Sequence, residues 1–451
     1  MTVPLCVDLD GTLVKSNLLI ETLVGALKHQ PLLVFALPLW LARGRAALKQ
    51  ELAQRGYVDV ALLPYDEKVL ADLRRERLAG RQVFLATAAD ESIARRIAAH
   101  LGVFDGVVGS DGRENLKGEA KARALTERFG EKGFDYIGND RHDIPVWERS
   151  REAIKVAPSR HGLAQLTRAL RVHQWAKNLL VFVPLLTSHR LLSGESIAES
   201  MLAFAAFSLV ASGVYLVNDL LDLEDDRRHP SKRKRPLAAG ELAIETAFVL
   251  VPVLLAAAAA ISVLLPWRFG ALLGAYVIGN LAYSLALKRV ALLDVFLLAG
   301  LYTLRILAGA AAIAVPVSHW LLAFSLFAFL SLAFAKRFVE VANVAARNEE
   351  GVEGRGYLAH DGPLLGMLGA ASGYLSVLVF ALYITSHEVV ALYKSPALLW
   401  FVVPLLLYWI SRVWLLAHRG RLHEDPVLFA LHDVPSWITF EVILVVMLLA
   451  A

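Results

Sequence analysis

The sequence predicts an α/β domain followed by an all-α bundle of about nine membrane-spanning helices. Three observations lead to this fold class. The chain is 57% hydrophobic and has a mean hydropathy of +0.52, more apolar than a soluble chain requires. Residues 1–170 contain 47 charged side chains, whereas the longer remainder contains 41. The first segment alternates β-rich with helical runs, and the second consists of long apolar stretches. A wholly soluble enzyme and a disordered chain are excluded.

Charge and cysteine content narrow the function further. The net charge of +4 does not indicate nucleic acid, because the basic excess lies in loops beside apolar spans, as the positive-inside rule expects. Cys6 is the only cysteine, so an internal disulfide is impossible and a cysteine metal site is disfavoured. The N-terminus lacks the basic region and long apolar core of a signal peptide.

Residues 1–160 are predicted to form the α/β domain, with a small helical cap at about 15–80. Residues 161–174 are an amphipathic linker, and 175–451 form the membrane domain. Open α/β sheets bind ligands beyond the carboxyl ends of their strands, where the polar motifs of this domain lie. The predicted strands are Val3–Val7, Gln82–Ala86, Val103–Val108, Phe134–Gly138 and Ile154–Ala157.

The segment DLDGTL follows the first predicted strand directly. Asp8 and Asp10 are two residues apart, so their carboxylates point to the same side. One can attack phosphorus while the other transfers a proton, and together they can bind Mg²⁺. Gly11 permits a sharp turn, and Thr12 can hold a phosphoryl oxygen. A simple surface turn is the alternative interpretation of this segment alone.

The segment DLDGTL resembles the first motif of haloacid-dehalogenase-like phosphatases, and the other motifs follow in order through about residue 160. The resemblance implies that Asp8 is the nucleophile, forming an aspartyl-phosphate, and that Asp10 is the general acid/base. A family fold without activity is the alternative. The other implied residues are Thr87 for the second motif, Lys117 or Lys121 for the third, and Asn139, Asp140 and Asp143 as further Mg²⁺ ligands in YIGNDRHDIPVW, where Asn139 replaces the usual acid.

The predicted cap contains an unusually apolar segment, residues 31–41, which is too short to span a bilayer. Core packing is the favoured explanation. The alternative is that Leu37, Trp40 and Leu41 contact the membrane or a lipid-linked substrate.

Charge in the loops of the membrane domain predicts its orientation. The loops on the side of the α/β domain contain 15 Lys and Arg residues, and the opposite loops contain 3. The chain is therefore expected to be a multi-pass protein of the cytoplasmic (inner) membrane, with the α/β domain and the active sites on the cytoplasmic side. The predicted spans are 176–192, 198–217, 243–265, 269–287, 291–315, 319–335, 364–385, 396–417 and 435–451.

An acidic group and a basic run follow the second predicted span. Asn218, Asp219, Asp222 and Asp226 would share one face of a helix. Acids at a membrane helix end are costly unless they hold a cation, and oxygen ligands at this spacing suit Mg²⁺ bridging a diphosphate. The basic run at residues 232–235 can bind further phosphate oxygens. A solvated loop explains the basic residues but not the acidic group.

The segment NDLLDLEDDRRHPSKRKRPLAAG resembles the acidic motif of the UbiA superfamily of intramembrane prenyltransferases, and more specifically that of decaprenyl-phosphate phosphoribosyltransferases. Other similar segments are RVHQWAKNLLVFVPL, YSLALKRVALLD, LRILAGA and KRFVEV. One departure is that many members have a second Asp-rich motif where this chain has Lys336 and Arg337.

The resemblance implies transfer of 5-phosphoribose from phosphoribosyl pyrophosphate to polyprenyl (decaprenyl) phosphate, with Mg²⁺ bound by Asp219, Asp222, Asp226 and Asn218. Arg305 is the most informative cation because it lies within an apolar span. The positive-inside rule explains Lys288 and Arg337 as well as a role in substrate binding does. Tyr283 and Tyr357 are explained either by substrate contact or by the aromatic belt at the membrane interface. The candidate substrate-binding residues are Lys177, Asn178, Lys232, Arg233, Arg235, Tyr283, Lys288, Arg305, Lys336 and Arg337.

Together the two halves suggest a two-step enzyme, in which the phosphatase-like domain removes the 5-phosphate from the lipid product. Two alternatives remain: a prenyltransferase that uses a prenyl diphosphate and an aromatic or other acceptor, and a channel or transporter with a regulatory domain. The second leaves the acidic group at 218–226 unexplained.

Overall fold

The computed structural model describes residues 3–55, 58–111, 114–157, 162–352, 354–422 and 425–451. The chain divides into two compact units. The first comprises Met1–Leu170 and Tyr215–Pro252, and the second Arg171–Val214 and Val253–Ala451. The predicted domain boundary after residue 160 falls within 158–161, outside the described residues.

The first unit contains a five-stranded parallel sheet in the order β3-β2-β1-β4-β5. This confirms the five predicted strands, although their ends differ. The largest difference is in β2, which continues past the predicted end at Ala86 as far as Asp90, with a register shift against β3. The strands are β1 (Leu5–Val7), β2 (Val83–Asp90), β3 (Gly106–Ser110), β4 (Asp135–Gly138) and β5 (Ala153–Lys155).

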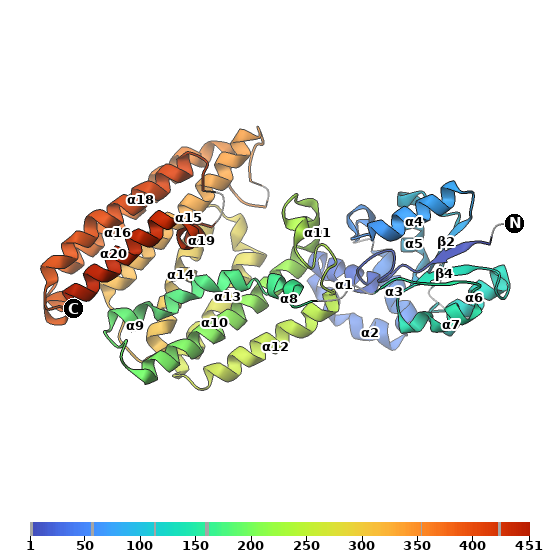
Figure 1. Cartoon of the computed structure of the whole chain (residues 1–451), viewed down its shortest axis with the longest axis horizontal. Helices are drawn as coiled ribbons and strands as arrows, with labels where there is room; N and C mark the ends of the chain where they lie inside the picture. The colour runs from blue at the N-terminus through green and yellow to red at the C-terminus, as the bar shows by residue number, and fades with distance from the viewer. Residues whose placement is uncertain (1–2, 56–57, 112–113, 158–161, 353, 423–424) are drawn as a thin grey trace. The chain divides into compact units, whose positions relative to one another are not determined.

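Helices cover both faces of this sheet (Figure 1). Successive side chains of a strand point to opposite faces, so Leu5 and Val7 enter one core while Cys6 enters the other. The first core includes residues of α4 (Glu67–Leu78) and α5 (Glu91–Leu101), and the second includes residues of α6 (Glu119–Phe129) and α7 (Ile144–Arg149). Strands β1, β2 and β4 are thereby fixed between two apolar layers, whereas Ala153 and Lys155 of the edge strand β5 are exposed.

The predicted cap is helical. Trp40 is 6% exposed in a small core with Ala26 and Leu52, and the Arg55 guanidinium lies 4.4 Å from its ring centre. Core packing therefore explains Trp40, whereas Leu41 is 54% exposed. The cap helices are α1 (Leu18–His29), η1 (Pro31–Phe35), α2 (Leu37–Ala42) and α3 (Arg45–Gln54), followed by η2 (Val60–Leu62).

Six helices among the described residues are long and apolar enough to cross a membrane. Two further helices, α13 (Trp267–Leu285) and the shorter α20 (Val434–Ala450), account for the fourth and ninth predicted stretches. The six are α10 (Gly194–Leu221), α12 (Ile244–Ser262), α14 (Leu293–Ala312), α15 (His319–Ala346), α16 (Gly362–Ile384, with the preceding turn from Ala359) and α18 (Val402–His418, with the preceding turn from Pro396).

The predicted span at 176–192 is not one helix, which corrects the count of nine. The chain there forms a 3-10 helix, η4 (Val172–Phe182), and a short α-helix, α9 (Val183–Thr187). Pro184 stands at the start of α9, where its missing N–H is tolerated. Lys177 and Asn178 are buried and hydrogen-bonded, so this apolar run carries polar groups inward.

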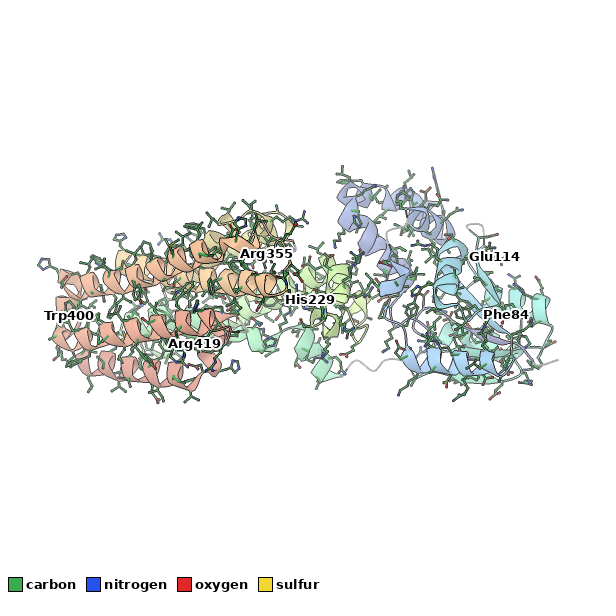
Figure 2. The ribbon with its side chains drawn as sticks, turned by 90° about the horizontal axis from the view of Figure 1, so that it is seen from above. Phe84, Glu114, His229, Arg355, Trp400 and Arg419 are labelled. Atoms are coloured by element: carbon green, nitrogen blue, oxygen red, sulfur yellow. The ribbon has the colours of Figure 1, made fainter. Side chains whose placement is uncertain are left out.

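In the second unit, α14 contributes to two cores. Val295 and Ala299 pack with residues of α15, α16 and α18, whereas Ala308 and Ala312 pack with residues of α10 and α13. Figure 2 shows Trp400 at one end of the unit and Arg355 towards the other. The buried position of α14 places its polar residues in the interior of the unit.

Candidate functional site

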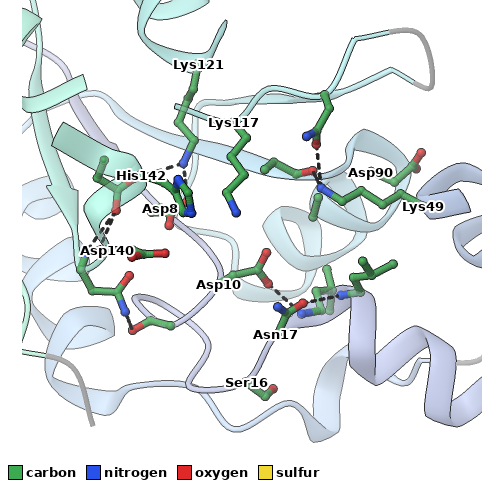
Figure 3. Close-up of a pocket in the computed structure, with 18 of the residues that line it drawn as sticks. Asp8, Asp10, Ser16, Asn17, Lys49, Asp90, Lys117, Lys121, Asp140 and His142 are labelled. Atoms are coloured by element: carbon green, nitrogen blue, oxygen red, sulfur yellow. Dashed lines mark hydrogen bonds and ion pairs between the residues drawn. The ribbon is translucent and has the colours of Figure 1, made fainter. Parts of the chain in front are cut away.

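A cavity of about 810 Å³ lies beyond the carboxyl ends of β1 and β4 in the first unit (Figure 3). Asp8 follows β1 and Asn139 follows β4, and these strands are neighbours although far apart in sequence. The sheet order changes direction at this point, which is where open α/β sheets bind ligands. Leu41 of the cap and Glu245 of α12 also line the cavity.

Lys121 is the lysine that contacts Asp8. Its Nζ donates to Asp8 Oδ1 over 2.7 Å and lies 3.4 Å from Asp143 Oδ1, with all three side chains nearly buried. Burial raises the pKa of Asp8 to about 6, against the opposing effect of Lys121. Although burial acts to lower it, the pKa of Lys121 is raised by Asp8 and Asp143. Lys117 points into the same cavity (Figure 3).

Asp143 organises the turn after β4. Its Oδ2 accepts from the backbone N–H groups of Asn139 and Asp140, each at 3.1 Å. Its Oδ1 accepts from the Tyr136 hydroxyl over 2.9 Å. Asp143 thus holds Asn139 and Asp140 at the cavity, where both are lining residues.

Asp10 lies across the cavity near the cap. Its Oδ1 accepts from the Leu18 N–H over 2.8 Å at the start of α1. Burial raises the pKa of Asp10, which favours a protonated carboxyl. Lys49 enters from α3, donating to Asn115 Oδ1 over 2.8 Å. Burial raises the pKa of both carboxyls, and Asp8 is in addition paired directly with Lys121, which favours its ionised form. This arrangement suits Asp8 to nucleophilic attack and Asp10 to proton transfer.

Two predicted hydroxyls are positioned differently from the expectation. Thr87 is fully buried in β2, where its Oγ1 accepts from the Ala89 N–H over 2.9 Å. Because β2 continues to Asp90, residues 88–90 line the cavity instead. Thr12 is also buried, and its Oγ1 donates to Asn139 Oδ1 over 3.1 Å.

Oxygen atoms at the cavity suit a divalent cation in type. Asp8 and Asp10 provide carboxylates and Asn139 an amide oxygen, the ligands that Mg²⁺ prefers. Within the part of the chain that the structure describes, no three His, Cys, Asp or Glu side chains are grouped to hold one metal. Mg²⁺ commonly takes one or two carboxylates and keeps water for its other positions, so the set fits.

The acidic motif is not on one continuous helix, contrary to the sequence prediction. Helix α10 ends at Leu221, Asp222 interrupts it, and α11 (Leu223–Arg228) follows. Nevertheless Asp219 and Asp226, each 2% exposed, converge on one cation. Arg235 Nη1 lies 3.2 Å from Asp219 Oδ1 and 2.5 Å from Asp226 Oδ2.

This motif also suits a divalent cation. Asn218 Oδ1 is buried and has no hydrogen-bond partner among the described residues. Burial raises the pKa of Asp226 and so disfavours its ionised form, whereas Arg235 opposes this shift. A bound cation stabilises the ionised carboxylate in the same way. The Asn218 oxygen and the converging carboxylates of Asp219 and Asp226 are of the ligand types that Mg²⁺ prefers.

The remaining basic candidates of the two units differ in exposure. Lys232 and Arg233 are exposed in η5 (Lys232–Lys234), and Lys288 is half-buried in η6 (Leu287–Arg289) of the second unit.

In the second unit, an aspartate whose side chain is 12% exposed joins two of the predicted lysines. Asp425 Oδ2 lies 2.9 Å from Lys177 Nζ and 3.2 Å from Lys336 Nζ. The Tyr302 hydroxyl donates to the same carboxylate over 3.2 Å. Although burial opposes it, the two lysines hold the pKa of Asp425 well below its usual range. Asp425 was not among the sequence candidates; the signal was an acid beside Pro426, in a domain with few acids.

Arg305 lies in the interior of the second unit, as its place in an apolar span predicts. Its Nε donates to Asn178 Oδ1 over 2.9 Å, and its Nη2 donates to the Tyr276 hydroxyl over 2.8 Å. Its guanidinium also lies 5.3 Å from the centre of the Tyr302 ring. Tyr302 therefore links Arg305 to the lysines around Asp425.

Arg337, another of the predicted substrate-binding residues, is the centre of a second polar network. It is fully buried, and its Nε lies 2.5 Å from Asp294 Oδ2. Its Nη2 donates to the Tyr283 hydroxyl over 2.8 Å. Tyr357, 2% exposed, donates to Asp294 Oδ1 over 2.5 Å. These contacts place both tyrosines in an internal network.

Comparisons with known proteins identify the family and several relatives of this chain. The model of the UbiA prenyltransferase family matches residues 181–437. The protein y4nM of Sinorhizobium fredii is 42% identical over 96% of this chain and 88% of its own length. The nodulation protein NoeC of Azorhizobium caulinodans is 37% identical over 59% of this chain and 87% of its own length.

The decaprenyl-phosphate phosphoribosyltransferase of Mycolicibacterium smegmatis is 36% identical over 41% of this chain, and the matched part is 59% of that enzyme's length. The match of the family model covers more than half of the chain, from η4 to the start of α20, and includes the acidic motif, the Arg337 network and Asp425, whereas Lys177 and Asn178 precede it. This multi-pass membrane protein with a transferase-type helical domain belongs to the UbiA prenyltransferase family.

Proposed function

We propose that the chain transfers 5-phosphoribose from phosphoribosyl pyrophosphate to a polyprenyl phosphate in the bilayer. The observation that carries this proposal is the convergence of Asp219 and Asp226 on Arg235, which joins the acidic and basic halves of one motif. The similarity to a decaprenyl-phosphate phosphoribosyltransferase supports the same donor and acceptor. The cations at Lys336 and Arg337, in place of a second acidic motif, suit a donor with several phosphate groups.

In this reaction the acidic motif binds the donor. Asp219, Asp222, Asp226 and Asn218 hold Mg²⁺, which neutralises diphosphate charge when bound. Arg235 neutralises Asp219 and Asp226 in the structure, and its guanidinium turns to a phosphate oxygen when donor binds. A phosphate oxygen of the acceptor then forms a bond to ribose C1 as the bond from C1 to pyrophosphate breaks.

The cations of the second unit are proposed to bind phosphate groups as well. Lys177 and Lys336 meet at Asp425, and Arg305 approaches them through Tyr302. These ammonium and guanidinium groups are fixed before substrate arrives, so little side-chain entropy is lost on binding. Lys232, Arg233, Lys288 and Arg337 are proposed to extend this binding of anionic groups.

The cavity at Asp8 then removes the 5-phosphate in a reaction of the haloacid-dehalogenase type. Asp8 attacks phosphorus, Asp10 gives a proton to the leaving ribose oxygen, and water releases inorganic phosphate. Lys121 neutralises charge at Asp8, while Asp8, Asn139 and Asp140 would hold the metal. Because both sites belong to one chain, the product of the first meets the second at a raised local concentration. The proposed location of both sites is the cytoplasmic face, from the loop charges.

Transfer is tested with purified protein, phosphoribosyl pyrophosphate, polyprenyl phosphate and Mg²⁺, with lipid products measured by mass spectrometry. Asp226→Asn and Asp222→Ala should each lower the transfer rate at least about a hundredfold, because a lost charge at a transferring diphosphate costs several kcal/mol. Asp225→Asn is the matched control: Asp225 is on the same helix, but its side chain is 61% exposed. Equal losses in all three variants would contradict the assignment.

Hydrolysis is tested by Asp8→Asn in the same assay. This variant should make lipid at the normal rate but accumulate the 5-phosphorylated form, since only the second step is blocked. Dephosphorylated lipid formed at the normal rate would contradict a role for Asp8. A parallel reaction with a prenyl diphosphate and an aromatic acceptor tests the prenyltransferase alternative, which gains support if only that reaction yields product.

A further inference from the structure

Arg227 connects the acidic helix α11 to the cap helix α1 within the first unit. Its Nη1 and Nη2 lie 3.0 and 2.5 Å from the two carboxylate oxygens of Glu21. The side chains are 8% and 5% exposed. The Nε of Arg227 also donates to the Ala238 carbonyl over 3.1 Å. One guanidinium therefore joins the cap, the acidic helix and the segment after the basic run.

Burial distinguishes this ion pair from its neighbours. A bidentate arginine–carboxylate ion pair fixes the relative orientation of the two side chains as well as their distance. Loss of one partner of a buried ion pair is strongly destabilising. Lys28 and Asp225 join the same two helices over 2.9 Å, but their side chains are 27% and 61% exposed. An exposed pair of this kind contributes little.

The contact reaches the proposed donor site through one peptide bond. Asp226 precedes Arg227 and holds Arg235, which also contacts Asp219. Helix α11 has only six residues and follows a break at Asp222. A helix this short has little stability of its own, so its position depends on side-chain contacts.

A second observation places the same segment against the N-terminal part of the unit. Gly240 has φ of +68°, and a Cβ atom there would come within 2.7 Å of Lys15 Cβ and 3.2 Å of Pro64. The turn that follows the basic run is therefore closely packed on residues that flank the cap.

We propose that Glu21 is a positioning residue for the acidic motif: it holds Arg227, and thereby keeps Asp226 facing Asp219. The N-terminal domain then has a structural part in transfer besides its own chemistry. This inference rests on the proposed function in taking the acidic motif as the donor site.

The test compares Glu21→Gln with Lys28→Gln in the full-length protein. Glu21→Gln should raise the Mg²⁺ concentration needed for half-maximal transfer by at least about tenfold, as loss of a residue that orients metal ligands typically does. Lys28→Gln should change it by less than about threefold. The exchanged pair, Glu21→Arg with Arg227→Glu, should recover part of the loss.

Amide hydrogen exchange of residues 219–229 provides a readout that does not depend on substrate. Glu21→Gln should speed exchange in this segment while leaving the β2 and β4 strands protected, and Lys28→Gln should not. If Glu21→Gln changes neither exchange nor Mg²⁺ dependence, or if the strands lose protection as well, the positioning role is wrong. If the wild type shows no transfer from phosphoribosyl pyrophosphate, the proposed function fails, and the exchange result still decides the role of Glu21.

Discussion

Lys121 contacts Asp8 directly, with Nζ 2.7 Å from Oδ1, although Lys117 matches the phosphatase-like motif as well in sequence. Lys121→Met should therefore lower hydrolysis of the 5-phosphate at least about a hundredfold, because Asp8 loses its only paired cation among the described side chains. Transfer should be unaffected. Lys117→Met is the matched control, and a larger loss in that variant would reverse the assignment.

Leu41 lies at the cavity and is 54% exposed, whereas Leu39 is 58% exposed but does not line it. If the cavity accepts a lipid-linked phosphate, Leu41→Ser should reduce hydrolysis of the lipid substrate several-fold, since apolar contact is lost. Hydrolysis of a soluble phosphate ester should change little. Leu39→Ser serves as the control, and equal losses on both substrates in Leu41→Ser would indicate a purely structural role.

Asp425→Asn removes the carboxylate between Lys177 and Lys336 and leaves two neighbouring ammonium groups without their shared counter-charge. The free energy of unfolding should fall by about 3 kcal/mol, as for other buried ion pairs that lose one partner. Thermal unfolding in detergent micelles measures this change. Glu349→Gln removes an acid from an exposed pair with Arg347 and should cost less than about 1 kcal/mol. A similar cost in both variants would contradict the buried role of Asp425.

The ionisation of Asp135 predicts that the stability of the first unit depends on pH. Although burial opposes it, hydrogen bonds and charge from Arg151 and Arg81 hold its pKa below the usual value. The ionised form therefore stabilises the fold above the unfolded pKa of about 4, and this contribution is lost as pH falls towards the lower folded pKa. Asp135→Asn should lower the unfolding temperature clearly at pH 7 but much less near pH 3. A difference that does not change with pH would show that charge is not the cause.

The sequence predicted the parallel sheet and most of the apolar helices because both depend on local periodicity. The five strands are marked by buried β-rich runs, and α14 by a long apolar run around Arg305. The break at Asp222 was missed, because the spacing of 218, 219, 222 and 226 fits a continuous helix equally well. The apolar run at 176–192 is wrongly predicted as a span for a different reason: apolarity alone does not distinguish a membrane-spanning helix from buried 3-10 turns.

The contacts that could not be predicted join residues far apart in the chain. Glu21 and Arg227 are 206 positions apart, and Lys177 and Asp425 are 248 apart. No local pattern marks either pair, because each partner alone resembles an ordinary charged residue. The choice between Lys117 and Lys121 has the same origin: only the position of α6 against β1 decides which ammonium group reaches Asp8.

The fully buried thiol in the central strand has a practical consequence for chemical labelling. Cys6 is the only cysteine of the chain, and burial raises the pKa of its thiol to about 12, so almost no reactive thiolate forms near neutral pH. A maleimide reagent should therefore leave the folded natural protein unmodified. Any cysteine introduced into a loop becomes the sole reactive position, and its access to a membrane-impermeant reagent in intact cells would report the side of the membrane on which that loop lies.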